Sequence, residues 1–171
     1  MRPSEIRRCV LDDHRMIRGM LDSIEILAWQ VLRGEQWPEG SLRFESEALL
    51  DSLRDHMQFE DVHLKPALMK SGILGPAGAR QLEKDHRFQR RLLEDGLVKL
   101  QDDERSAMTL ARNLLDLLQL VRIDMRSEEA FQLREDVLCD SVAPGPRGVD
   151  RRKLEPWRVA ANVSSGGCLG S

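Results

Sequence analysis

A polar pair in an otherwise apolar helical stripe constrains this sequence most. His56 and Glu60 are four residues apart, so on a helix they lie one above the other on the same face. The face continues in steps of four and three, the spacing of a helix that packs into a bundle core. Its residues are Leu49, Leu53, His56, Glu60, His63 and Ala67. Because an unpaired buried carboxylate costs several kcal/mol, the pair predicts partners on neighbouring helices.

Three further segments are apolar along one helical stripe except at a single level. The exceptions are His14 in the first, His86 in the second, and Asp124 with Glu128 in the third. Polar residues of four helices are therefore expected to meet in the core. The three stripes are Val10, His14, Ile17, Leu21, Ile24, Ala28 and Val31; Leu82, His86, Arg90 (or Gln89), Leu93, Leu97 and Leu100; and Leu110, Leu114, Leu117, Val121, Asp124, Glu128 and Phe131.

Breaker residues between the stripes predict an all-α fold. Ser4 and Ser41 are expected N-caps, as are the aspartates at 102 and 103, and Pro66 is expected to kink the second helix or begin its end. Short connections favour antiparallel neighbours, so we expect an up-down-up-down four-helix bundle. The helices are expected at about residues 4–33, 41–70, 76–100 and 104–139.

Composition divides the chain into one domain and a tail. Residues 1–140 suit a single bundle with a sizeable core, whereas residues 141–171 are rich in Pro, Gly and Ser and lack a helical period. That second segment is typical of a disordered tail.

Charge and composition exclude several classes of function. The net charge is -3 and the basic residues are scattered among acidic ones, so nothing favours nucleic-acid binding. No apolar run is long enough to span a membrane, and the amino end lacks the apolar region of a secretory signal. Three distant cysteines without a Cys-x-x-Cys motif suit a reducing compartment, so we expect a cytoplasmic protein.

Three interpretations compete for the buried polar level. Imidazole and carboxylate groups together suit iron, manganese or zinc, and bundle cores are a usual place for such centres. The same residues could instead form a hydrogen-bonded network, which is costly unless every member is satisfied. Hydrolysis by His and Glu lacks a nucleophile. We favour the metal site, because three histidines and three acids converge.

The pattern resembles the hemerythrin-like (HHE) family of cation-binding four-helix bundles. The resemblance covers about residues 6–138. The matching pieces are Asp13-His14, His56-x-x-x-Glu60 followed by Pro66-Ala67-Leu68, Asp85-His86, and Met125-Arg126-Ser127-Glu128-Glu129.

Members of that family hold a non-haem di-iron centre that binds dioxygen or nitric oxide, or senses oxygen and iron. The resemblance implies that His14 and His56 serve one iron and His86 the second, with Glu60 and Glu128 as bridges. It also implies two iron ions per chain, or one if the second half of the site is incomplete.

Two positions depart from the family pattern. Asp124 stands where the family usually has a histidine, and Arg90 stands where the related oxygen carriers have one. The position at His14 and His56 is therefore expected to bind metal better than the position at His86. Arg90 is expected to pair with Asp124 or to turn outward. Sensing, storage or detoxification is favoured over reversible dioxygen carriage.

Other polar residues have less clear roles. Glu60-x-x-His63 and Glu83-x-x-His86 match the Glu-x-x-His element of ferritin-like proteins, but that assignment would leave two histidines unused. His63 is expected at the outer rim as a modulator or spare ligand, and Arg90 as a second modulator. The remaining acids are expected to face solvent: Asp13, Asp55, Asp85 and Glu129.

We therefore expect a monomeric or weakly dimeric iron protein that binds or senses dioxygen, nitric oxide or iron, rather than an enzyme acting on an organic substrate. A metal-free interaction bundle that has lost its site is the first alternative. A di-iron redox enzyme of the peroxidase type is the second. The sequence specifies no protein partner.

Overall fold

A computed structural model describes residues 1–35, 39–101 and 106–140, and only the backbone of residues 96–101. The described residues are helical and contain no strand, which confirms the predicted all-α class. The predicted boundary at residue 140 stays a prediction, because the tail lies outside the described residues. The elements are α1 (Pro3–Leu32), α2 (Glu39–Phe59), the π-helical turn η1 (Glu60–Leu64), α3 (Lys65–Lys70), α4 (Gly75–Gln101) and α5 (Ala107–Phe131).

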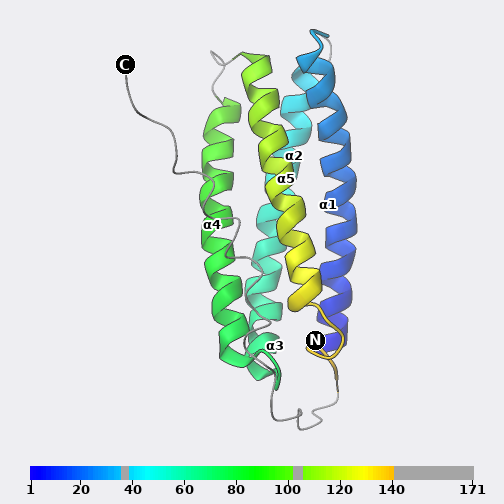
Figure 1. The fold of residues 1–171 in the computed structure, drawn as a ribbon, viewed down its shortest axis with the longest axis vertical. Coiled ribbons are helices and arrows are strands. Elements are labelled where there is room, and N and C mark those ends of the chain that lie inside the picture. Colours follow the sequence, from blue (N-terminus) through cyan, green and yellow to red (C-terminus); the bar gives the residue numbers. More distant parts are fainter. Residues whose placement is uncertain (36–38, 102–105, 141–171) are drawn as a thin grey trace, which may run out of the picture.

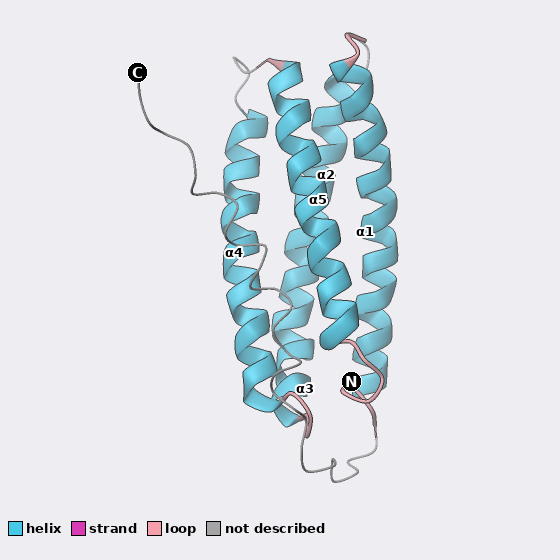
Figure 2. Ribbon diagram, in the orientation of Figure 1, coloured by secondary structure: helices cyan, strands magenta, loops and turns pink. Residues whose placement is uncertain are grey.

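Four long helices lie side by side along the length of the molecule (Figures 1 and 2). Helix α1 ends and α2 begins at one end of the bundle, whereas α3 and the start of α4 lie at the other end, near the amino terminus. Helix α1 packs against α2 and α5, and α4 packs mainly against α2 and α3. Helices α4 and α5 make few contacts with each other. The bundle is therefore least closed along the α4–α5 side.

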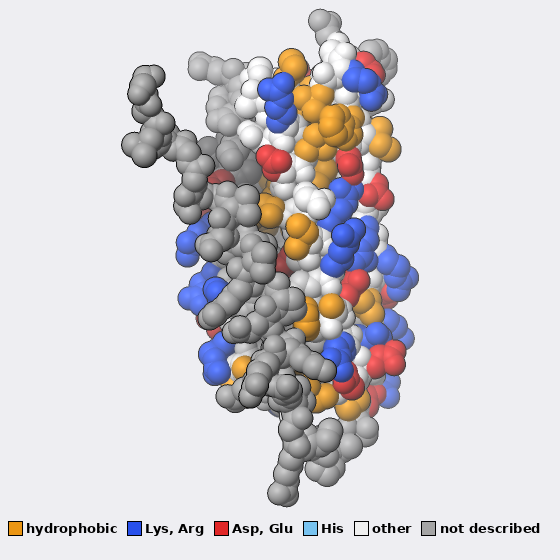
Figure 3. Space-filling view, viewed as in Figure 1, with side chains coloured by type: hydrophobic (Ala, Val, Ile, Leu, Met, Phe, Trp, Pro, Cys, Tyr) orange, Lys and Arg blue, Asp and Glu red, His pale blue; other side chains and the backbone are white. Residues whose placement is uncertain are grey.

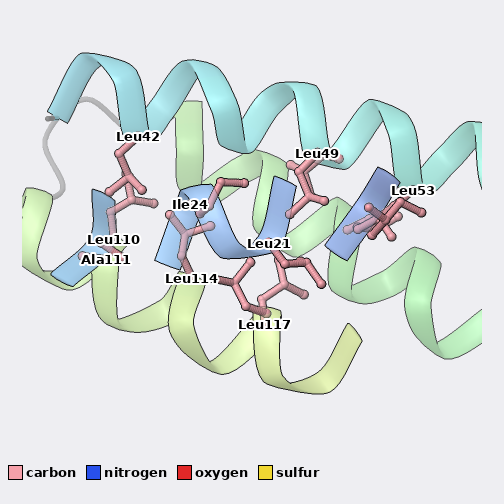
Figure 4. Packing of buried hydrophobic residues seen from close by; sticks show 14 of the residues in the cluster. Leu21, Ile24, Leu42, Leu49, Leu53, Leu110, Ala111, Leu114 and Leu117 are labelled. Atoms are coloured by element: carbon pink, nitrogen blue, oxygen red, sulfur yellow. The ribbon is translucent and has the colours of Figure 1, made fainter. Parts of the chain in front are cut away.

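The apolar core is divided into two clusters. The larger cluster contains Ile17 to Val31 of α1 with apolar side chains of α2, α4 and α5, many of which point toward one another (Figure 4). The smaller cluster lies nearer the amino terminus and includes Val10, Leu64 and Leu82. Several buried polar residues fall between the two clusters along the chain, as His14 does between Val10 and Ile17 and Glu60 does between Met57 and Leu64. Apolar packing on both sides therefore holds the polar level in place.

The second long helix is not continuous, because a π-helical turn interrupts it at Glu60–Leu64. The backbone N–H of Lys65 donates to the carbonyl of Glu60, five residues back. Such a turn holds one more residue than an α-helical turn, so it moves the buried stripe by one position. Leu64 and Leu68 are buried, in place of the predicted His63 and Ala67. The sequence pattern was thus correct up to Glu60 and wrong beyond it.

The last helix is shorter than predicted. Helix α5 ends at Phe131, and the chain then turns so that Leu133, Val137 and Leu138 pack into the smaller apolar cluster. The prediction of a helix to residue 139 is therefore wrong beyond Phe131. The turn closes the bundle beneath the polar level.

Predicted helix caps differ from the observed ones. Arg2 is the N-cap of α1, and the hydroxyl of Ser4 instead donates to Asp140 at 2.6 Å. Ser41 lies inside α2, which begins at Glu39. Ser106 caps α5 by accepting the backbone N–H of Thr109. The aspartates predicted for this role, at 102 and 103, lie outside the described residues.

The surface carries both signs of charge. On the face shown in Figure 3, Lys and Arg side chains are interspersed with Asp and Glu, and hydrophobic side chains lie between them, several of them grouped near the top. Among the described residues, no helix combines the length and hydropathy that crossing a bilayer requires.

Candidate metal centre

Four buried side chains from four elements meet at the polar level. They come from α1, α2, η1 and α5, and each offers one donor atom within 4.8 Å of the other three. Their exposed fractions lie between 0% and 7%. The residues are His14, His56, Glu60 and Glu128. The structure thus brings together four of the six residues that the sequence predicted for the site.

Several donor atoms in this cluster lack a hydrogen-bond partner. His14 Nε2, Glu128 Oε2 and Glu60 Oε1 are buried and unsatisfied, although the first two atoms are only 3.2 Å apart. Buried polar atoms in native proteins almost always have a partner, so unsatisfied ones need an explanation. Donor atoms that bind one zinc-sized ion lie at most about 4.2 Å apart, so small side-chain rotations bring these four to one ion. A cation fits both the unsatisfied atoms and the spacing.

His86 lies beside this cluster and shares Glu60 with it. Its ring is fully buried, and its Nε2 atom is 3.0 Å from Glu60 Oε2. The same carboxylate oxygen is 3.6 Å from His56 Nε2. Glu60 therefore lies between His56 and His86.

Asp124 and Arg90, the two departures from the family pattern, lie apart from the cluster of four. Asp124 is half-buried and accepts a hydrogen bond from the side chain of Gln89. Arg90 is exposed and donates to Asp61, not to Asp124. Arg90 was expected either to pair with Asp124 or to turn outward, and in the structure it turns outward. The guanidinium charge is thereby neutralised by a carboxylate of η1.

Burial and crowding of acids change the protonation of the centre. Burial, together with the charges of Asp85 and Glu60, raises the pKa of Asp124 to about 7. Burial and the neighbouring carboxylates Glu60 and Asp124 raise the pKa of Glu128 well above its usual range. Burial lowers the pKa of His56, but the adjacent carboxylates outweigh this effect and the net pKa is raised. The centre therefore binds protons more strongly near neutral pH than the same side chains would in water.

Outer carboxylates bind the other nitrogen of His14 and of His86, and a third carboxylate lies near that of His56. Glu129 Oε1 is 2.9 Å from His14 Nδ1, and Asp61 Oδ1 is 2.9 Å from His86 Nδ1. Asp13 lies 3.5 Å from His56 Nδ1. The prediction that Glu129 faces solvent is therefore wrong, whereas Asp13 remains partly exposed and only lies near its histidine.

Sequence reasoning missed these contacts for a physical reason. Adjacent residues do not share a face of their own helix, but an acid beside a core position can still reach a histidine on the neighbouring helix. A signal was present, since an acid directly follows each buried glutamate, in Glu60-Asp61 and in Glu128-Glu129.

The remaining candidates lie outside the centre. The ring of His63 packs on Phe59 with centroids 4.7 Å apart. Glu83 pairs with Lys65 at 3.1 Å, so the ferritin-like assignment through Glu83 is not supported. Asp55 is exposed, as expected, whereas Asp85 is half-buried and accepts hydrogen bonds from Gln81.

A comparison with family models decides the classification. The model of the hemerythrin HHE cation-binding domain matches residues 6–132, which is most of the chain. The chain belongs to this family. The match to the hemerythrin HHE domain extends from α1 to the end of α5 and includes all six predicted site residues. No curated protein and no solved structure matches the chain.

Proposed function

We propose that this hemerythrin HHE domain is a cytoplasmic non-haem iron protein that holds two iron ions and binds or senses dioxygen, nitric oxide or iron itself. The observation that carries the proposal is the cluster of four buried donor atoms within 4.8 Å of one another, on side chains that each have a buried atom without a hydrogen-bond partner. Imidazole and carboxylate donors in such a mixture suit iron. The family description, a cation-binding domain, points the same way.

Each half of the centre is assigned its own residues. His14 and His56 hold the first ion, His86 and Asp124 hold the second, and Glu60 and Glu128 lie between the two. We also propose that the four long helices run antiparallel, in an up-down-up-down order. Short connections favour this order. When bound, iron supplies a redox-active Lewis acid to which a diatomic gas can bind. The chain supplies the donor set, a buried environment and the carboxylates that hold the histidines.

A cavity on the α4–α5 side of the bundle supports the proposal that the ligand is small and apolar. It has a volume of about 770 Å³ and reaches His56 and Asp124 from the α4–α5 side. Most of its lining is apolar, including Leu93, Leu117 and Val121. Dioxygen and nitric oxide are small and weakly polar, so an apolar cavity that reaches His56 and Asp124 gives them access to the centre.

Metal analysis tests the proposal directly. Protein made in iron-replete cells and purified without air is expected to contain about two irons per chain, with a near-ultraviolet band that appears in air. One iron per chain would support the His14 and His56 half alone. No iron, together with a Tm that added ferrous iron does not change, would contradict the proposal and favour a metal-free bundle.

Replacing Asp124 tests the weaker half of the centre. Asp124→His restores the imidazole that the family usually has at this place, and it also removes a carboxylate from a crowded acidic site. Affinity for the second ion is expected to rise on the order of tenfold. Competition with a ferrous chelator measures this affinity, and Asp116→His, on the same helix, is the matched control. An unchanged second affinity would contradict the assignment of Asp124.

A further inference from the structure

The sequence around two of the histidines is repeated. Residues 13–18 of α1 and residues 85–90 of α4 both have the pattern Asp-His-Arg-x-x-Arg. Each repeat packs against a buried glutamate that is directly followed by a second acid, in Glu128-Glu129 and in Glu60-Asp61. The contacts made by the two repeats are also the same.

The first set of contacts joins α1 to α5. His14 Nε2 is 3.2 Å from Glu128 Oε2, and His14 Nδ1 is 2.9 Å from Glu129 Oε1. Arg18, one helical turn after His14, donates to the same oxygen of Glu129 at 2.6 Å. Arg18, Glu129 and His14 form what we name the first clamp.

The second set joins α4 to η1. His86 Nε2 is 3.0 Å from Glu60 Oε2, and His86 Nδ1 is 2.9 Å from Asp61 Oδ1. Arg90, one turn after His86, donates to the other oxygen of Asp61. Arg90, Asp61 and His86 form the second clamp. Each half of the centre therefore has one clamp.

A clamp determines which ring nitrogen faces the centre. An anionic carboxylate accepts the Nδ1–H, so Nδ1 keeps its proton and Nε2, which faces the inner glutamate, is the nitrogen available to a cation. The arginine holds that carboxylate in place and charged. Burial raises the pKa of Asp61, but hydrogen bonds from His86 and Arg90 outweigh it and the net pKa is lowered. The pKa of Glu129 is lowered in the same way by His14 and Arg18, against the effect of burial.

We propose that Arg18 and Arg90 are positioning residues that fix His14 and His86, respectively, for metal binding. Neither arginine touches the inner donor atoms. Arg18 acts through the carboxylate of Glu129, and Arg90 acts through that of Asp61. This inference rests on the proposed iron binding. It also assigns a role to Arg90, which the family pattern alone marks as a lost ligand.

The third histidine provides an internal contrast. His56 Nδ1 is 3.5 Å from Asp13 and has no hydrogen-bond partner. Its ring instead lies against that of His14, with centroids 4.9 Å apart. His56 is thus held by packing, whereas His14 and His86 are held by charged hydrogen bonds. Loss of a clamp is therefore expected to affect one half of the centre and spare the other.

The repeat supplies its own control variants. Arg15 and Arg87 occupy the third position of each repeat, and both are exposed. Arg15 pairs with the nearby Asp12 of its own helix. Arg18→Gln and Arg90→Gln remove a clamp, whereas Arg15→Gln and Arg87→Gln remove the same charge from the same helix turn without touching a clamp. Arg18 and Arg90 are partly exposed at 36% and 45% of their side chains, so neither change opens a core cavity.

Ferrous iron affinity, measured anaerobically by chelator competition, tests the proposal. Each clamp variant is expected to bind one ion on the order of tenfold more weakly, with the other ion unaffected. The control variants are expected to match the wild type within about twofold, given the weak effect of distant exposed charges. Arg18→Lys and Arg90→Lys are expected to recover part of the loss, because they restore the charge but not the forked geometry. Equal affinities in clamp and control variants would overturn the proposal.

A second measurement does not depend on iron. In metal-stripped wild type, nitrogen-15 NMR is expected to detect slowly exchanging Nδ1 protons on His14 and His86. Arg90→Gln is expected to speed exchange at His86 alone, and Arg18→Gln at His14 alone. If the wild type binds no iron but the exchange pattern holds, the proposed function fails and the clamps stand. If iron binds but both readouts match the controls, the clamps fail and the function stands.

Discussion

Glu60→Gln is expected to abolish tight binding of both iron ions while leaving the helical fold intact. Glu60 is fully buried, lies 3.0 Å from His86 Nε2 and 3.6 Å from His56 Nε2, and belongs to the cluster of four donors. A neutral amide keeps the volume of the side chain but loses the charge that offsets a cation. Loss of an outer partner of a metal ligand already costs about 10–100-fold in affinity, so we expect more than about 100-fold here.

The same variant separates a metal centre from a structural polar network. In metal-stripped protein, Glu60→Gln is expected to be at least as stable as the wild type, because one charge is removed from beside Glu128 and Asp124. Iron affinity and Tm are measured together, with Glu47→Gln at an exposed position of α2 as the matched control. A variant that loses stability but keeps full iron affinity would show that Glu60 is structural.

The apolar stripes were enough to predict which residues meet. His14, His86 and Glu128 are buried as the helical spacing requires, because the 3.6-residue period fixes which face of each helix enters the core. The level of the polar residues along the bundle follows well for the second and third helices, whose polar residues lie equally far from their connection, and less closely for the third and fourth. The inner residues of the centre were therefore predictable from spacing alone.

The π-helical turn was not predictable from spacing, and it changes the site. Pro66 lacks the N–H that an α-helix needs at that position, and the interruption lies in the turn immediately before it. With one extra residue in the turn, Glu60 remains in the core while Asp61 reaches His86. His63 is moved off the core face by the same change. π-helical turns are frequent at functional sites, and here the turn places one inner and one outer carboxylate on the same histidine.

The outer carboxylates were missed because helical spacing describes one helix at a time. Glu129 and Asp13 lie beside the core face of their own helices, where a polar residue normally meets water. The neighbouring helix brings a histidine to each of them instead. Contacts across a helix interface depend on interaxial distance and rotation, and no single-helix pattern contains these quantities.

Metal-stripped protein is expected to lose stability as the pH rises from about 5 to 8. Asp124 and Glu128 have raised pKa values in the folded chain, so over this range the folded state binds more protons than the unfolded state. Burial lowers the pKa of His86, but Glu60 and Asp61 outweigh it and the net pKa is raised. The stability that His86 contributes is complete below its unfolded value of 6.5 and is lost as the pH rises through its folded value. The acids and the histidine therefore act in the same direction.

The size of this effect is limited by solvent at Asp124. One pKa unit corresponds to about 1.4 kcal/mol, and Asp124 is half-buried, so we expect a loss on the order of 2 kcal/mol, or roughly 5–8 °C in Tm. Below about pH 4 stability is expected to fall as the pH falls. Asp61 and Glu129 have lowered pKa values in the folded chain, so the stability that they contribute is lost when they become protonated. Maximum stability without metal is thus expected near pH 5. Asp124→Asn is expected to flatten the slope between pH 5 and 8.

Iron is expected to invert this dependence. Cations compete with protons for the same nitrogen and oxygen atoms, so the stabilisation that iron supplies grows as the pH rises. Thermal unfolding of stripped and iron-loaded protein at pH 5, 6, 7 and 8 measures both slopes. Opposite slopes would mean that the protons held by Asp124, Glu128 and His86 are the ones that iron displaces. Parallel slopes would mean that the groups that titrate are not metal ligands. That result would contradict a link between the buried acids and cation binding.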